Sequence, residues 1–235
     1  MKIVIAGASG GIGSAFVKAL AGRPGIDRIV ATCNSHSSVM DHPRVSWQQL
    51  DLTDEAAIRE WAAQLDEIDW LINAAGVLHT PAQGPEKTIR QVDPGFFLEN
   101  MRINALPALL LAKHLHGKFR HARPALFATV SARVGSIKDN RLGGWFSYRA
   151  SKAALNMCLK TLSIEWRRTL PNVAVVALHP GTTDTALSRP FQRNLPEGQL
   201  LAPEFSVDCM LNVLDNLGPA QSGRFLAFDG EQLPW

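Results

Sequence analysis

The chain has 235 residues, of which 46% are hydrophobic and 19% charged, and its formal net charge at pH 7 is +3. This composition excludes a disordered, solvated chain, and the length favours one domain over residues 1–235. The weak, dispersed charge argues against nucleic-acid binding, and three widely spaced cysteines argue against a disulfide framework or a zinc site, so we expect reduced thiols and a cytoplasmic location.

Short apolar runs alternate with longer helical patterns along the chain. The runs predicted as strands are residues 2–6, 28–32, 45–51, 70–73, 125–131, 173–179 and 224–228. The segments predicted as helices are residues 10–21, 54–65, 93–116, 147–170 and 203–217. Runs that are apolar on successive residues are typical of parallel strands covered on both faces. We therefore expect an α/β protein with a three-layer Rossmann fold, in which a doubly wound, mostly parallel seven-stranded sheet carries helices on both faces.

Two further segments, residues 77–92 and 182–202, are rich in Pro, Gly and polar residues and are expected to be loops. The richest apolar run, residues 105–112, ends at Lys113 and is too short for a membrane span, which needs about 20 residues. Residues 3–6 form a strand pattern and not a leader, so we expect neither export nor a membrane partner.

A glycine-rich turn follows the first predicted strand. Glycine permits positive φ and close approach of the backbone to an anion, and the next helix offers its N-terminal N–H groups and dipole. The alternative is an ordinary tight turn, and the lack of a lysine after the glycines disfavours an ATP-binding loop. The residues expected to bind the pyrophosphate of a dinucleotide are Gly7, Ser9, Gly10, Gly11, Ile12 and Gly13.

The end of the second predicted strand bears on the choice between NADP and NAD. It continues as Cys33, Asn34, Ser35 and His36, without the acidic residue that binds the free 2′-hydroxyl of NAD. No arginine or lysine stands next to Asn34 either. We expect Asn34 to lie at the adenosine ribose and NADP to be the cofactor, with NAD as the alternative.

Tyr148 is the single tyrosine of the chain and precedes Lys152 by four residues at the start of a helical segment. This spacing places both side chains on one helix face. A nearby ammonium lowers the pKa of a phenol, so the pair is suited to general acid and base catalysis. The alternative is an amphipathic tyrosine on an interfacial helix.

Several short motifs carry a resemblance to a known family. They are the glycine turn, Asn73-Ala74-Ala75-Gly76, Asn104, Ser131, Tyr148-Arg149-Ala150-Ser151-Lys152 and Pro180-Gly181. Their order and spacing resemble the short-chain dehydrogenase/reductase family over almost the whole chain, and residues 131–136 and 143–148 resemble its C-factor and carbonyl-reductase-like branch. The resemblance implies an NADP-linked oxidoreductase that interconverts a ketone or aldehyde and its alcohol by hydride transfer.

The resemblance also implies roles for four residues. Ser131 would hydrogen-bond the substrate oxygen, and Tyr148 would be the general acid and base. Lys152 would bind the nicotinamide ribose and lower the pKa of Tyr148, while Asn104 would anchor a water that relays protons. From the residues alone, Ser131 ends a strand where ligands bind in such sheets, and Pro107 predicts a kink near Asn104.

Further cofactor contacts are implied by the resemblance alone. Asp51 and Leu52 would contact the adenine, although Asp51 is also placed to cap a helix. The segment Asn73, Ala74, Ala75 and Gly76 would line the adenine ribose, and Ala74 departs from the asparagine usual in the family. The residues that would hold the nicotinamide carboxamide are Pro180, Gly181, Thr183 and Thr185.

Other interpretations remain at this point. A C-factor-like signalling or redox-sensing NAD(P)-binding protein would share the fold. A nucleotide-sugar epimerase would need more chain after Pro180, and Ser131 lacks the surroundings of a hydrolase nucleophile. His114 and His116 point in different directions on one helix, so no metal site is expected.

Two expectations concern ligands and partners. Trp145, Phe146 and residues 187–201 are expected to border a cleft for an apolar or medium-sized carbonyl substrate. A homodimer or homotetramer is expected through the helices that contain Asn104 and Tyr148.

Overall fold

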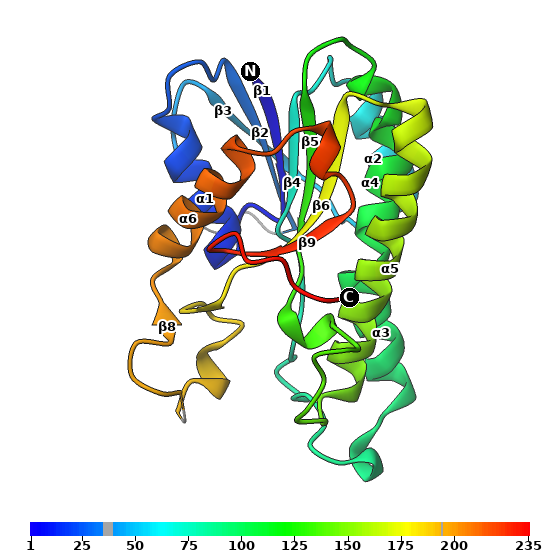
Figure 1. Cartoon of the computed structure of the whole chain (residues 1–235), viewed down its shortest axis with the longest axis vertical. Coiled ribbons are helices and arrows are strands. Elements are labelled where there is room, and N and C mark those ends of the chain that lie inside the picture. Colours follow the sequence, from blue (N-terminus) through cyan, green and yellow to red (C-terminus); the bar gives the residue numbers. More distant parts are fainter. Residues whose placement is uncertain (35–39, 194) are drawn as a thin grey trace.

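The computed structural model describes residues 1–34, 40–193 and 195–235, so Ser35 and His36 lie outside the described residues. Seven parallel strands form one sheet in the order β3-β2-β1-β4-β5-β6-β9 (Figure 1). The strands are β1 (Lys2–Ala6), β2 (Arg28–Cys33), β3 (Val45–Gln49), β4 (Trp70–Asn73), β5 (Ala125–Val130), β6 (Val173–His179) and β9 (Arg224–Ala227). The chain order reverses at β1, which confirms the doubly wound Rossmann fold.

Helices cover both faces of the sheet (Figure 1). The helices α1 (Gly11–Ala21) and α6 (Pro203–Asp215) cover one face. The helices α2 (Glu55–Ala63), α3 (Pro94–Asn104), α4 (Leu106–Leu115) and α5 (Phe146–Thr169) lie on the other side. Because β1 and β9 share one sheet, we propose that residues 1–235 make up one domain.

The core consists of two apolar clusters, one on each face. Ile3 and Ile5 of β1 point into the cluster beneath α1 and α6, while Val4 and Ala6 point into the other. In the second cluster the ring of Trp166 lies 5.3 Å from that of Phe127, measured between centroids. Burial on both faces explains why these strands are apolar on successive residues.

The long helix expected at residues 93–116 is broken into α3 and α4 at Ala105. Pro107 has no N–H group, and its ring crowds the carbonyl of the preceding turn. The kink expected near Asn104 is therefore a complete break, and Asn104 is the last residue of α3.

The two expected loops contain short elements that have no sequence periodicity. Residues 77–92 include a 3₁₀ turn at Ile89–Gln91. In the other loop, β7 (Thr182–Thr183) pairs in parallel with β8 (Leu200–Leu201). In the described part of the chain no helix combines the length and the apolar character that a bilayer span requires.

Candidate active site

Two adjoining cavities lie at the carboxyl ends of the strands. The larger has a volume of about 550 Å³ and is lined by Ser131, Tyr148 and Lys152, among others. The smaller, of about 410 Å³, is lined by residues of the glycine turn and by Asn34 and Asp51. Because both cavities share the wall formed by residues 74–76, one extended ligand can occupy both.

The glycine turn packs tightly against the end of β4. Gly7 has φ +71°, and a Cβ atom there would come within 2.7 Å of the Ala75 nitrogen. A Cβ at Gly13 would approach the Gly7 carbonyl oxygen to 2.3 Å. No side chain caps α1 at Gly10, so its first N–H groups remain available to an anion.

Asp51 and Asn34 both line the smaller cavity, as expected. The carboxylate of Asp51 accepts hydrogen bonds from the Thr53 nitrogen and hydroxyl, each 2.8 Å long. These bonds lower the pKa of Asp51, which is therefore ionised at neutral pH. Leu52 also lines this cavity.

Arg102 is a cation in the smaller cavity that sequence reasoning missed. Its guanidinium donates to the Thr53 hydroxyl at 2.6 Å and pairs with Glu99 at 2.8 Å. No motif marks Arg102, because it reaches the cavity only where α3 lies beside Thr53, in the segment that follows β3. Its charge is balanced by Glu99, one turn earlier on the same helix.

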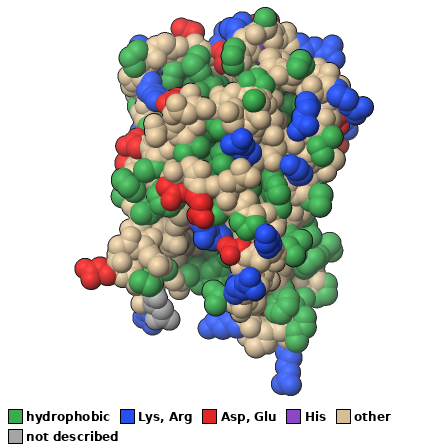
Figure 2. Space-filling view, viewed as in Figure 1, with side chains coloured by type: hydrophobic (Ala, Val, Ile, Leu, Met, Phe, Trp, Pro, Cys, Tyr) green, Lys and Arg blue, Asp and Glu red, His purple; other side chains and the backbone are tan. Residues whose placement is uncertain are grey.

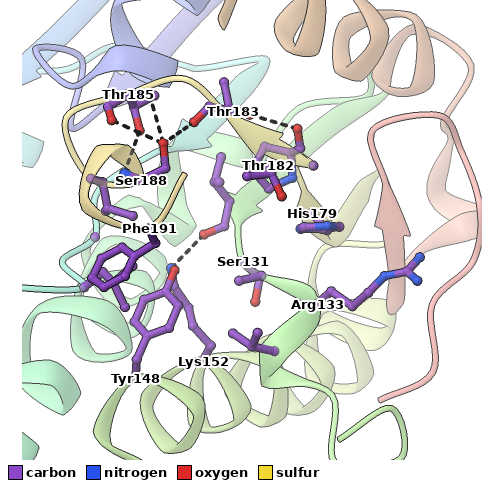
Figure 3. A pocket seen from close by; sticks show the side chains of 18 of the residues that line it. Ser131, Arg133, Tyr148, Lys152, His179, Thr182, Thr183, Thr185, Ser188 and Phe191 are labelled. Atoms are coloured by element: carbon purple, nitrogen blue, oxygen red, sulfur yellow. Dashed lines mark hydrogen bonds between the residues drawn. The ribbon is translucent and has the colours of Figure 1, made fainter. Parts of the chain in front are cut away.

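Tyr148 and Lys152 lie on one face of the first turns of α5, and both side chains are buried. The Lys152 Nζ atom lies 5.9 Å from the centroid of the Tyr148 ring and donates to the Val130 carbonyl at 3.2 Å. Figure 3 shows both residues and Ser131 around the same opening. The spacing of the two residues is thus realised as a shared site.

Burial, and not Lys152, sets the direction of the pKa of Tyr148 in the structure. Burial raises the pKa of Tyr148 above its ordinary value instead of letting the lysine lower it. Burial also lowers the pKa of Lys152 to about 8. Desolvation of the phenolate outweighs the attraction of an ammonium 5.9 Å from the ring, so Tyr148 remains protonated at neutral pH.

Ser131 follows β5 and donates a 2.6 Å hydrogen bond to the side-chain oxygen of Asn156. Asn156 was missed from the sequence, although it continues the four-residue spacing of Tyr148 and Lys152 along α5. The side-chain nitrogen of Asn156 is buried and has no partner among the described residues. Asn156 therefore orients the Ser131 hydroxyl from the same helix.

Asn104 ties the end of β4 to α5. Its side-chain oxygen accepts from the Val77 nitrogen at 2.7 Å, and its nitrogen donates to the Val77 carbonyl and the Ser151 hydroxyl, each at 2.9 Å. A Cβ at Gly76 would lie 3.2 Å from this side-chain oxygen and 3.3 Å from Lys152 Nζ. Asn104 thus lies beside Lys152, while its role in water relay stays a prediction.

The residues expected at the nicotinamide carboxamide come together beside the larger cavity. Pro180, Gly181, Thr183 and Thr185 all line it. The Thr183 hydroxyl donates to the Pro180 carbonyl at 3.0 Å, which fixes this turn. Thr185 lies against the glycine turn, because a Cβ at Gly11 would come within 2.6 Å of its methyl group.

Aromatic side chains from two segments form the rim of the larger cavity, and His79 packs against one of them from outside the lining. The ring of Phe191 lies 5.1 Å from that of Trp145 and 5.9 Å from that of His79, and Trp145 lies 6.2 Å from Tyr148. Phe146 is not part of this wall, contrary to expectation, and its side chain is 38% exposed. At the start of a helix, successive side chains point in different directions, so Trp145 and Phe146 cannot share one wall.

The alternative chemistries find no matching geometry. The Ser131 hydroxyl donates to Asn156 and not to His179, so no hydrolase triad forms at this strand end. The His114 Nε2 atom lies 3.0 Å from the Glu55 Oε1 atom, whereas the His116 ring packs edge-on against the ring of Trp166. Within the described ranges, no cluster of His, Cys, Asp or Glu could hold a metal ion.

Comparisons with known proteins agree with this geometry. A family model described as short chain dehydrogenase matches residues 1–196. C-signal of Myxococcus xanthus is 36% identical over 168 residues, which cover 72% of this chain and 93% of that protein. A 1-hydroxy-2-glutathionyl-2-methyl-3-butene dehydrogenase of Rhodococcus sp. (strain AD45) is 29% identical over 238 residues and 99% of both chains.

Solved structures show the same arrangement over the whole chain. The NADPH-bound carbonyl reductase from chicken fatty liver superposes with a TM-score of 0.87 at 29% identity, covering 100% of this chain and 98% of that one. The carbonyl reductase Sniffer of D. melanogaster gives a TM-score of 0.87 at 25% identity, covering 100% and 99%.

Proposed function

The chain belongs to the short-chain dehydrogenase family, a family of oxidoreductases, and from this we propose that it interconverts a ketone or aldehyde and the corresponding alcohol with NADP as cofactor. The observation that carries the proposal is the buried pair of Tyr148 and Lys152 in a cavity continuous with the glycine turn. A phenol and an ammonium in this position serve proton transfer to a carbonyl oxygen.

The two cavities fit a dinucleotide. The uncapped N-terminus of α1 is suited to the pyrophosphate, and the ionised Asp51 beside Leu52 is suited to the adenine amino group. Lys152 would hold the nicotinamide ribose, and Thr183 and Thr185 the carboxamide end. When bound, the nicotinamide supplies or accepts the hydride.

NADP is the proposed cofactor and NAD the alternative. Asn34 brings no negative charge to the smaller cavity, so nothing at this position repels a 2′-phosphate. Two similar structures are described as NADPH-bound and as having bound NADP. A Michaelis constant for NADPH well below that for NADH is the expected result.

In the proposed reduction, Ser131 turns its single hydroxyl proton from the Asn156 side-chain oxygen, which accepts it in the structure, to the substrate oxygen. Tyr148 is protonated at neutral pH and gives its proton to the same oxygen as hydride reaches the carbon. The Lys152 ammonium then stabilises the phenolate. Asn104 holds the backbone at Val77 beside this group.

Lys152 gives the proposed reaction a pH dependence. Because the pKa of Lys152 is lowered to about 8, its ammonium is present below this pH and is lost above it. We expect kcat/KM for carbonyl reduction, which reports groups of the free enzyme, to fall as the pH rises through about 8. A Lys152→Met variant should be slow at every pH and lack this inflection, whereas an unchanged inflection in that variant would assign it to another group.

The larger cavity favours an apolar or medium-sized carbonyl substrate. Trp145, Phe191 and Leu142 line it, and the charge of Arg133 is paired with Glu231 at 2.6 Å. Following NADPH absorbance across aldehydes, ketones and quinones tests cofactor, reaction class and substrate together. Turnover confined to highly charged compounds would contradict the proposed substrate class.

C-signal, at 36% identity, favours a second candidate, a signalling or redox-sensing protein that binds NAD(P) with little turnover. Such a protein needs the dinucleotide cavity but no buried proton donor. Binding of NADPH without oxidation by any member of the carbonyl panel would select this candidate.

We also propose that the chain forms a homodimer or homotetramer through α3, α4 and α5. Large apolar side chains on these helices are exposed, namely Leu98, Leu109, Met157 and Ile164. Figure 2 shows apolar side chains gathered over the region of α3 and α5. Exposed patches of this kind mark association surfaces.

Replacing both Met157 and Ile164 by glutamate should dissociate the oligomer, because the charges would be buried in the interface. Light scattering coupled to size-exclusion chromatography measures the mass. Phe205→Glu, at an exposed apolar site on α6, is the matched control and should leave the mass unchanged. Dissociation by the control alone would place the interface on the other face.

A further inference from the structure

Glu86 is a buried acid in the loop at residues 77–92, with a side chain only 2% exposed. One carboxylate oxygen accepts from the Ser147 nitrogen at 3.1 Å, and the other accepts from the Ser147 hydroxyl. The Glu86 backbone carbonyl accepts from the Trp145 nitrogen at 2.5 Å. Glu86, which stands 61 positions before Ser147, therefore binds both residues that flank Phe146, the first residue of α5.

Glu86 is not neutralised by a basic side chain. None of the ion pairs found between described residues includes it. Its carboxyl group instead faces the N-terminus of α5, where the first N–H groups have no partner within the helix. This is a capping interaction supplied by a separate loop.

The start of α5 needs such external support. Trp145 precedes the helix with φ 54° and gives it no side-chain cap. Among the described residues Trp145 is the only non-glycine residue with positive φ, and Gly143 and Gly144 before it have φ 65° and 66°. A left-handed conformation is unfavourable for a residue with a Cβ atom, so contacts from outside must hold it.

The first turn of α5 and Trp145 before it carry the proposed proton donor, Tyr148, and part of the aromatic rim of the larger cavity. Tyr148 is the third residue of α5, and its ring lies edge-on to that of Trp145 at 6.2 Å. Trp145 in turn contacts Phe191 across the cavity at 5.1 Å. Displacement of the first turn would move Tyr148 relative to Ser131 and Lys152, which sit on a strand end and deeper in the helix.

We propose that Glu86 is a positioning residue, which anchors the first turn of α5 and thereby sets the place of the Tyr148 hydroxyl and the Trp145 ring. Its effect on turnover rests on the proposed function, whereas its effect on the position of Tyr148 does not. Glu86 contacts neither reacting atoms nor the dinucleotide cavity, and it acts through Ser147 and Trp145.

The test compares Glu86→Ala with Glu86→Gln, which keeps the shape and one acceptor oxygen. In Glu86→Ala we expect kcat to fall about 10- to 100-fold, because small displacements of a reacting group are costly, while the KM for NADPH changes less than about twofold. Glu86→Gln should recover most of the lost kcat. An equal rise in the KM for NADPH in both variants would indicate general loosening and would overturn the positioning role.

A second readout needs no activity. Tyr148 is the only tyrosine, so protein labelled with ¹³C-tyrosine gives the NMR signals of one ring. The Trp145 ring current acts on that ring, so Glu86→Ala should shift or broaden its signals and Glu86→Gln should largely preserve them. Glu86→Ala removes the side-chain bonds to Ser147 but keeps the backbone carbonyl that binds Trp145, so unchanged signals would refute anchoring by the Glu86 side chain. If the wild-type protein shows no carbonyl turnover but Glu86→Ala still shifts the Tyr148 signals, the result would support the anchoring and reject the proposed function.

The matched control is Asp93→Ala. Asp93 caps α3 by accepting from the Phe96 nitrogen at 2.7 Å and lines neither cavity. Loss of this cap should leave kcat and the Tyr148 signals unchanged. A double-variant comparison adds a further test. Ser147→Ala should reduce kcat in the wild-type background but have little further effect in Glu86→Ala, because both substitutions remove the same hydrogen bond between the Ser147 hydroxyl and Glu86. Additive effects would show that Ser147 and Glu86 act independently.

Discussion

Replacing Tyr148 by phenylalanine is expected to lower kcat for carbonyl reduction by about 10² to 10⁴-fold while the affinity for NADPH stays nearly unchanged. The substitution removes the proton donor but keeps the ring that packs against Trp145 at 6.2 Å. The cavity keeps its shape, and the glycine turn, 135 or more residues earlier in the chain, is not touched. Only the proton transfer is lost.

Steady-state rates with the best carbonyl substrate and a fluorescence titration with NADPH separate the two effects. Phe146→Leu is a suitable control, because Phe146 begins the same helix but its side chain is exposed and does not line the cavity. This control should retain wild-type turnover. Wild-type turnover in Tyr148→Phe itself would place the chemistry on another group.

Gly7→Ala should destabilise the protein by about 2–5 kcal/mol and abolish tight NADPH binding. A Cβ atom at φ +71° costs about 1–2 kcal/mol, and overpacking against the backbone of Ala75, 2.7 Å away, adds about 1–3 kcal/mol. The strain falls on the wall that both cavities share. Urea unfolding and an NADPH titration measure the two effects.

Gly25→Ala isolates the backbone contribution. Gly25 has φ +78°, but a Cβ there would have no atom within 4 Å. The Gly25→Ala substitution should therefore lower the free energy of unfolding by only about 1–2 kcal/mol and leave NADPH binding intact. Equal destabilisation by Gly7→Ala and Gly25→Ala would mean that the close approach of the new Cβ atom at residue 7 to Ala75 adds no cost.

Most strands were predictable because they are buried on both faces and so are apolar along their length, whereas the edge strand β3 is partly exposed and ends in two polar residues. The ends of β1, β4 and β6 agree with the predicted ranges, and all seven strands lie in one sheet. The break at Ala105 was foreseen only as a kink, since Pro107 signals a weak point without fixing its extent. The two-residue strands β7 and β8 have no period that a sequence could show.

The site was predictable where its residues form local motifs, as Tyr148 and Lys152 do on one helix. Glu86 and Phe191 come from loops, and only tertiary packing brings them to α5 and the rim. The direction of the Tyr148 pKa was missed because it depends on burial, which spacing along a helix does not reveal. Asn156 was within reach of the same spacing argument.

The segment that follows β6 touches both ends of the site. Thr185 rests on the glycine turn, and Phe191, six residues later, closes the aromatic rim. One short stretch of chain therefore borders both the proposed dinucleotide site and the proposed substrate site, so a substitution in it is expected to change the binding of both ligands.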